Sequence, residues 1–141
     1  IGDGVLAIFA GGKPHEVCVA ALRAERSMRV KLADLGRKRE RSGQPVADIH
    51  LGLHVGDVFY GNSGSVDRLD FTVVGQAVNE VSRIASMCNS VDRDNLLSSD
   101  FVALLPEEER ARLVSVGRYA LRGVGRATEL FTRDPELDMG D

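Results

Sequence analysis

The chain has 141 residues, a formal net charge of −3 and 43% hydrophobic residues, which is enough apolar material for the core of one domain. The negative charge argues against a nucleic-acid partner, because such proteins need an excess of basic side chains near the phosphates. No apolar stretch reaches the roughly 20 residues that span a bilayer, so we expect no membrane contact by this domain.

The two cysteines, Cys18 and Cys88, lie in apolar helical stripes and show no CxxC pattern. This usage predicts buried thiols in a reducing compartment, so we expect a cytoplasmic domain whose parent protein could still be membrane-anchored. The chain also starts without Met, directly before an apolar run. We therefore expect an N-terminally truncated piece that begins partway through a domain.

The first half of the chain predicts a strand, a long helix and a second strand. Residues 5–10 (VLAIFA) lie between glycines and are typical of a short buried strand. Pro14 suits the first turn of a helix that runs to about Glu40, and residues 48–55 alternate like a half-buried strand. The predicted apolar face of the long helix consists of Ala21, Ala24, Met28, Leu32 and Leu35.

The second half predicts hairpins and shorter helices. A loop rich in Gly, Ser and Asp leads to a strand at 70–74, and a helix follows at about 76–88. The remaining elements are expected in the order strand 96–98, short helix 99–105, and a hairpin with strands at 113–121 and 127–133. Helices interleaved with hairpins favour an α+β fold with a mixed, mainly antiparallel sheet flanked by helices.

Asn79 and Arg83 stand four residues apart near the start of the predicted helix 76–88. Residues at this spacing are about 40° apart around a helix, so both side chains leave the same face. A polar pair near a helix N-terminus suits an anionic ligand, because free N–H groups and the helix dipole favour negative charge there. The alternative is an ordinary solvated face.

Three segments, in order, resemble the catalytic domain of class III nucleotide cyclases, most nearly the bacterial adenylate cyclases. IGDGVLAIF at 1–9 resembles the family's GDGxLAxF segment, and LGLHVGDVFYGNSGSVDRLDFTVVGQAVNEVSR at 51–83 resembles its longest signature. LRGVGRATELFTR at 121–133 resembles its closing hairpin. The resemblance implies a ferredoxin-like cyclase domain over residues 1–134, followed by a C-terminal tail at 135–141.

The resemblance implies an adenylate cyclase, which converts ATP to 3′,5′-cyclic AMP and pyrophosphate by in-line attack of the ribose 3′-hydroxyl on the α-phosphate. Asp3 matches one of two aspartates that hold two divalent cations, Mg²⁺ or Mn²⁺, and hard cations do prefer carboxylate oxygen. Asn79 matches the residue that orients the ribose. Arg83 matches the arginine that stabilises charge on the α-phosphate.

Two further positions are implied to bind substrate. Thr72 matches the base-recognition position, where a hydroxyl can still bond the adenine amino group. Val124 stands where the family often has a phosphate-binding lysine, so Arg122 is expected to bind the phosphates, with Arg126 as the alternative.

The family works as a head-to-tail dimer, so we expect a homodimer whose two sites each combine Asp3 of one subunit with Asn79 and Arg83 of the other. Two alternatives stay open: a guanylate cyclase, and a catalytically inactive domain used for regulation or dimerisation. His50 and His54 share one face of the strand 48–55. Without a third ligand in sight, a structural role is expected for both.

Overall fold

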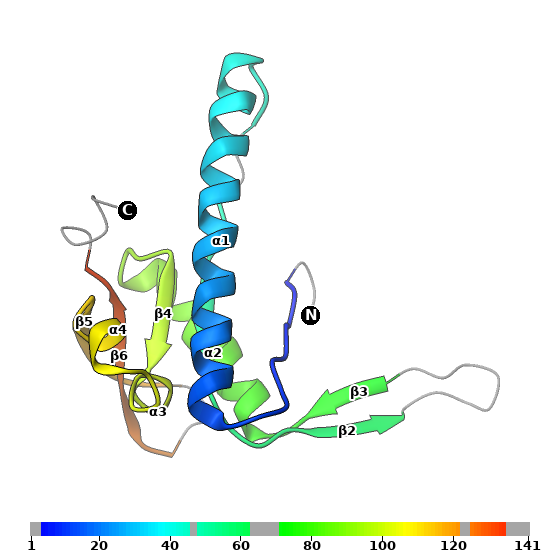
Figure 1. Cartoon of the computed structure of the whole chain (residues 1–141), viewed down its shortest axis with the longest axis vertical. Helices are drawn as coiled ribbons and strands as arrows, with labels where there is room; N and C mark the ends of the chain where they lie inside the picture. The colour runs from blue at the N-terminus through cyan, green and yellow to red at the C-terminus, as the bar shows by residue number, and fades with distance from the viewer. Residues whose placement is uncertain (1–3, 46–47, 63–70, 122–124, 135–141) are drawn as a thin grey trace.

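The computed structural model describes residues 4–45, 48–62, 71–121 and 125–134. Within these residues the helices and strands occur in the order α1 (Pro14–Arg41), β1 (Leu51–Leu53), β2 (Phe59–Asn62), β3 (Phe71–Val74), α2 (Gln76–Ser90), β4 (Asn95–Ser98), α3 (Ser99–Val102), α4 (Glu107–Arg110), β5 (Leu113–Ala120) and β6 (Ala127–Arg133). The predicted α+β fold with a mixed sheet and flanking helices is confirmed (Figure 1).

The main sheet has the strand order β1-β4-β6-β5. β1 and β4 pair in parallel, with Gly52 opposite Leu96, whereas β6 pairs antiparallel with both β4 and β5. The parallel pair requires a long connection, and the hairpin β2–β3 and helix α2 supply it. The β2–β3 hairpin forms a separate two-stranded sheet that extends away from the body (Figure 1).

Helices α1 and α2 cover opposite faces of the main sheet. Successive residues of a strand point to opposite faces, and on β4 Leu97 packs with the buried residues of α1 while Leu96 packs with those of α2. On β6, Phe131 packs on the α1 side and Leu130 on the α2 side. The face of β1 that carries Gly52 therefore lies under α2 and does not face solvent.

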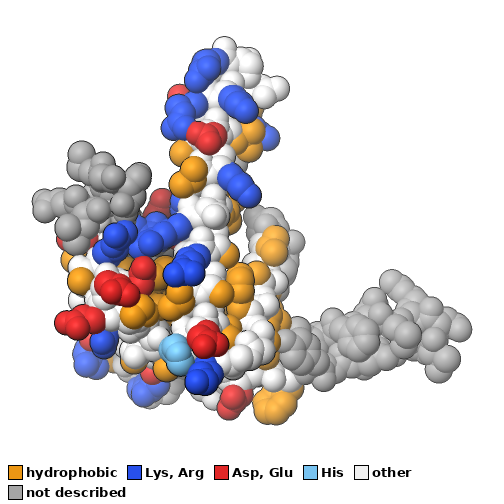
Figure 2. All heavy atoms as spheres, viewed as in Figure 1, with side chains coloured by type: hydrophobic (Ala, Val, Ile, Leu, Met, Phe, Trp, Pro, Cys, Tyr) orange, Lys and Arg blue, Asp and Glu red, His pale blue; other side chains and the backbone are white. Residues whose placement is uncertain are grey.

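The N-terminal half of α1 carries the helix contacts with the core. Cys18, Ala21, Leu22 and Glu25 are its buried residues. The predicted apolar face is wrong at two of its members, because Ala24 and Leu35 are exposed. The C-terminal half projects beyond the body (Figure 1), where Lys and Arg side chains gather along it (Figure 2). An apolar stripe is buried only as far as the sheet beneath it extends.

The predicted strand at 5–10 is also wrong. In the described residues 4–10 the chain has no regular secondary structure, and Val5 is 95% exposed. An apolar run becomes a strand only when a neighbour accepts and donates its backbone hydrogen bonds. None of the described strands pairs with this segment. The strand predicted at 48–55 is shorter than expected and covers only β1, which pairs with β4 alone among the described strands.

Candidate functional site

Helix α2 lies unusually close to the strand below it, and glycines make this approach possible. A Cβ atom added to Gly52 would lie 3.0 Å from both Ala85 N and Val81 O, and one added to Gly56 would lie 2.6 Å from Ala77 Cβ. Gly75, at the N-cap of α2, has a φ of 147° that disfavours other residues. These glycines allow the short distance between α2 and the segment below it.

Asn79 and Arg83, the predicted catalytic residues, lie on α2 and are both exposed. Within the described part of the chain neither side chain is engaged in a hydrogen bond or ion pair, so both are open to a ligand. The first turn of α2 has no side-chain cap and no acidic residue. The local field is therefore favourable to an anion, as the spacing predicts.

The structure describes only some of the other predicted site residues. Thr72 lies on β3, where its backbone pairs with Gly61, and only the turn at Gly75 separates this strand from α2. Asp3 and Arg122 lie outside the described residues. Arg126, the alternative to Arg122, has its Nη2 atom 3.5 Å from Oδ2 of Asp100 on α3. The structure thus places Asn79 and Arg83 on the same helix. The roles predicted for Asp3 and Arg122 stay predictions.

His54 occupies a buried position between the sheet and α2, and its side chain is only 5% exposed. Its Nδ1 atom lies 2.7 Å from Ser98 Oγ, and its Nε2 atom lies 2.8 Å from Glu80 Oε2. This geometry agrees with the structural role predicted for His54. The sequence carried a signal for it, because glycines stand two residues before and two residues after His54, and small residues at this spacing indicate an element packed closely above.

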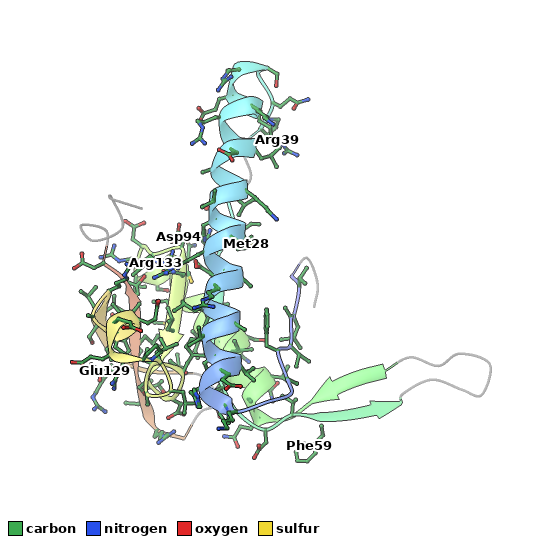
Figure 3. The ribbon with its side chains drawn as sticks, in the orientation of Figure 1. Met28, Arg39, Phe59, Asp94, Glu129 and Arg133 are labelled. Atoms are coloured by element: carbon green, nitrogen blue, oxygen red, sulfur yellow. The ribbon has the colours of Figure 1, made fainter. Side chains whose placement is uncertain are left out.

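A second polar cluster, around Glu25, was missed by sequence reasoning. The Glu25 carboxylate is buried and accepts hydrogen bonds from Arg29, Arg133 and Asn95. Thr132 completes the cluster by donating to the Asn95 side chain over 2.6 Å. Figure 3 shows Arg133 beside the middle of α1. A carboxylate on the apolar face of α1 was the available signal, since Glu25 is four residues after Ala21.

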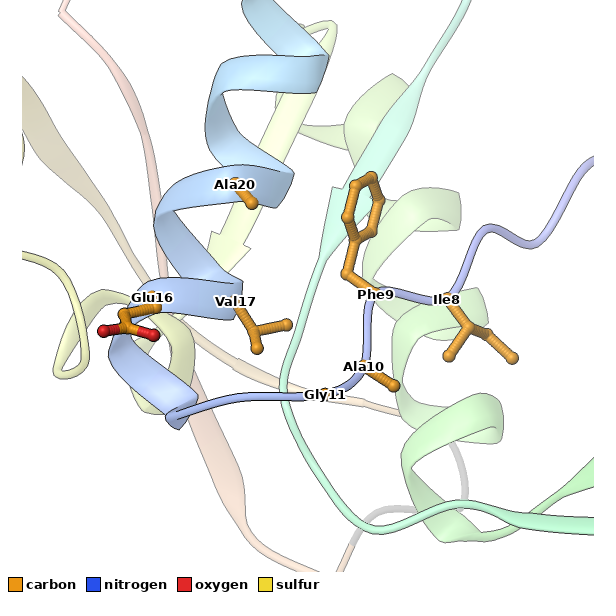
Figure 4. A pocket seen from close by; sticks show the side chains of 7 residues that line it. All are labelled: Ile8, Phe9, Ala10, Gly11, Glu16, Val17 and Ala20. Atoms are coloured by element: carbon orange, nitrogen blue, oxygen red, sulfur yellow. The ribbon is translucent and has the colours of Figure 1, made fainter.

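No group of three or more His, Cys, Asp or Glu side chains that could hold a metal ion occurs among the residues the structure describes. A hollow of about 320 Å³ lies between residues 8–11 and the first turns of α1 (Figure 4), and Glu16 is its charged residue. A second hollow lies between Asp48 and Asp94. Asn79 and Arg83 line neither of these two hollows.

Both thiols are buried and free, as predicted. Burial raises the pKa of the Cys18 thiol, because the thiolate is poorly solvated in the core. Burial also raises the pKa of Cys88, and the hydrogen bond from its Sγ atom to the Leu51 carbonyl opposes this only in part. Neither thiol is suited to act as a nucleophile at neutral pH.

The chain is similar to several bacterial proteins. It is 32% identical over 133 residues to an uncharacterized protein of Mycobacterium tuberculosis, covering 92% of this chain and 22% of that protein. It is 29% identical over 116 residues to an adenylate cyclase of Anabaena cylindrica, covering 81% of this chain and 23% of the relative. The chain thus spans less than a quarter of these relatives. No family model matches it.

The fold is shared with solved cyclase structures. The adenylyl cyclase CyaB of P. aeruginosa superimposes with a TM-score of 0.72 at 22% identity, over 89% of this chain and 62% of that one. The guanylyl cyclase Cya2 superimposes with a TM-score of 0.67 at 21% identity, over 83% and 57%. The chain therefore has the class III nucleotide cyclase fold. The resemblance seen in its sequence motifs is confirmed.

None of the helices that the structure describes is both long enough and apolar enough to cross a bilayer.

Proposed function

We propose that this domain is a nucleotide cyclase that converts ATP to 3′,5′-cyclic AMP and pyrophosphate. The observation that carries the proposal is the exposed pair Asn79 and Arg83 on α2, in a chain with the class III cyclase fold. Both residues stand at the positions that the family motif assigns to ribose and α-phosphate contacts. The adenylate cyclase of Anabaena cylindrica supports the choice of reaction.

Each residue has a physical task in this proposal. Arg83 stabilises the negative charge that builds on the α-phosphate as the 3′-oxygen attacks, and Asn79 holds the ribose so that this oxygen is in line. Thr72 contacts the adenine base, and Arg122 contacts the phosphates. The open first turn of α2 favours the same anionic ligand.

Divalent cations remain part of the proposal, with Asp3 as the ligand that this chain contributes. Two such ions, Mg²⁺ or Mn²⁺, would neutralise charge on the triphosphate when bound. The described residues offer no other cluster for them, so no step of the reaction is assigned to them.

A homodimer is the proposed active form, and the surface of the domain supports it. Asn79 and Arg83 are both exposed, so a second copy packed against this face of α2 would enclose a substrate there. Large apolar side chains are exposed on the projecting elements, including Val30 on α1, which is 64% exposed, and Phe59 on β2, which is 65% exposed. Figure 3 shows Phe59 pointing away from the body. A partner that covers such side chains removes their apolar surface from water, which favours association.

GTP is the second candidate substrate, because the fold is equally that of the guanylyl cyclase Cya2. Thr72 does not decide the matter, since a hydroxyl both donates and accepts hydrogen bonds.

The test is product formation by the full-length protein supplied with ATP or GTP and Mn²⁺. We expect cyclic AMP from the wild type, and a loss of kcat on the order of 10³-fold in Arg83→Ala. Arg118→Ala, an exposed arginine on β5 at the far edge of the sheet, is the matched control and should keep full activity.

Three outcomes would change the proposal. Cyclic GMP as the main product would make the protein a guanylate cyclase. No cyclic product from a folded dimer would favour the regulatory alternative. Loss of folding in Arg83→Ala, measured by circular dichroism, would remove the catalytic assignment of this residue.

A further inference from the structure

His54 and Glu80 form a buried link between the sheet and α2 that the proposed chemistry does not use. The His54 side chain is 5% exposed and that of Glu80 is 20% exposed. One ring nitrogen contacts Glu80 on α2, and the other contacts Ser98 at the end of β4. The imidazole therefore joins α2 to the end of β4, and Ser98 is 44 residues from His54 in the chain.

Both ring nitrogens of His54 take part in this link. Nε2 lies 2.8 Å from Oε2 of Glu80, and Nδ1 lies 2.7 Å from the hydroxyl oxygen of Ser98. That hydroxyl in turn accepts from the backbone N–H of Phe101 over 3.2 Å, as the N-cap of α3. The link therefore continues from α2 through both nitrogens of the imidazole to the N-cap of α3, and each polar group in it has a partner.

Glu80 directly follows Asn79 and precedes Arg83 by three residues on α2. Its carboxylate leaves the helix on a neighbouring flank, so fixing it fixes the rotation of α2 about its own axis. Gly52 and Gly56 set how closely the helix approaches, and the link acts together with the buried side chains of Ile84 and Cys88 to hold its rotation. Rotation of α2 would move the exposed Asn79 and Arg83 together.

We propose that His54 and Glu80 are positioning residues, which hold α2 at the rotation that aims Asn79 and Arg83 at the nucleotide. This inference rests on the proposed cyclase function. A displacement of about 1 Å at reacting groups can lower a rate on the order of 10²-fold, whereas ground-state binding of the nucleotide responds less. The link should thus affect kcat more than KM.

The test uses steady-state kinetics of the full-length protein with ATP. His54→Leu and Glu80→Leu remove the link, and we expect each to lower kcat between about 10-fold and 100-fold while KM changes less than about twofold. Glu80→Gln keeps an acceptor for His54 Nε2 and should retain most of the activity. His50→Gln is the matched control, since His50 directly precedes β1 as His54 directly follows it, and its Nε2 atom lies 3.5 Å from Oδ2 of Asp48.

An activity-free measurement separates this inference from the proposed function. Amide hydrogen exchange in α2 should be faster in His54→Leu and Glu80→Leu than in wild type, and unchanged in His50→Gln and Glu80→Gln. Should the wild type make no cyclic nucleotide, the cyclase proposal fails and the exchange result still tests the link. Folded Leu variants with wild-type kcat, or with unchanged exchange in α2, would overturn the positioning role. If His54→Leu does not fold, the variants of the more exposed Glu80 test the same role.

Discussion

The buried carboxylate of Glu25 joins three elements at the scale of single residues. It accepts from Arg29 within α1, from Asn95 on β4 and from Arg133 on β6. A buried charge of this kind is costly to leave without its partners. Asn95 and Arg133 come from strands distant in sequence, so the cluster ties α1 to the sheet.

We expect Glu25→Gln to lower the free energy of unfolding by about 3 kcal/mol, because the two arginines lose the charge that they face. Urea denaturation of the wild type and the variant measures this. Asp34→Asn is the control: its partner Arg37 lies three residues away on the exposed part of α1, and exposed pairs contribute less than about 1 kcal/mol. Equal losses in the two variants would show that the Glu25 cluster is not a special contributor to stability.

The buried thiols predict a dependence of stability on pH. Burial raises the pKa of both Cys18 and Cys88 in the folded protein. At alkaline pH the unfolded chain releases these protons first, so unfolding becomes easier. The contribution is fully present at neutral pH and is lost as the pH rises through the folded pKa values.

We therefore expect the free energy of unfolding to fall from neutral to alkaline pH, and to fall less steeply in Cys18→Ala/Cys88→Ala. Urea denaturation at a series of pH values measures both slopes, and the variant corrects for the titration of other groups. Parallel slopes would contradict the assignment to the thiols.

At the scale of elements, the close packing of α2 against β1 decides where the candidate site lies. A Cβ at position 52 would meet backbone atoms of α2, which cannot move without shifting the whole helix. Overpacking of this kind costs about 1–3 kcal/mol. Asn79 and Arg83 lie on the helix that would be displaced.

Gly52→Ala should therefore lose both stability and kcat, measured by urea denaturation and by cyclic nucleotide production. Gly125→Ala is the matched control for stability, because a Cβ there would meet nothing within 4 Å. A Gly52→Ala protein with wild-type kcat would mean that the close packing of α2 on β1 is not critical for the site.

At the scale of the whole molecule, the proposed site needs two copies of the chain. If Asp3 of one subunit acts with Arg83 of the other, Asp3→Asn and Arg83→Ala homodimers are both inactive. A mixed dimer has one site with both defects and one intact site.

Mixing the two inactive proteins should thus restore cyclic nucleotide production to about a quarter of the wild-type level, since about half of the dimers are mixed and each has one intact site. Each variant alone at the same total concentration is the control. No recovery in a mixture shown to exchange subunits would argue that the site lies within one subunit.

Local patterns in the sequence were enough to predict α2, the β5–β6 hairpin and the α+β class. Their periodicity and turn residues act over a few positions, and those interactions are present before the chain folds. The same holds for Asn79 and Arg83, whose shared face follows from helical geometry alone. The motif resemblance to class III cyclases was also readable from the sequence.

Only the tertiary structure decided which apolar segments find a partner. The run at 5–10 has the composition of a strand but pairs with none of the described strands, and Leu35 lies on a part of α1 beyond the sheet. The contacts of His54 with Ser98 and Glu80, and of Glu25 with Arg133, join residues far apart in the chain. Such contacts depend on how the elements pack, because no local pattern specifies which distant side chain will satisfy a buried polar group.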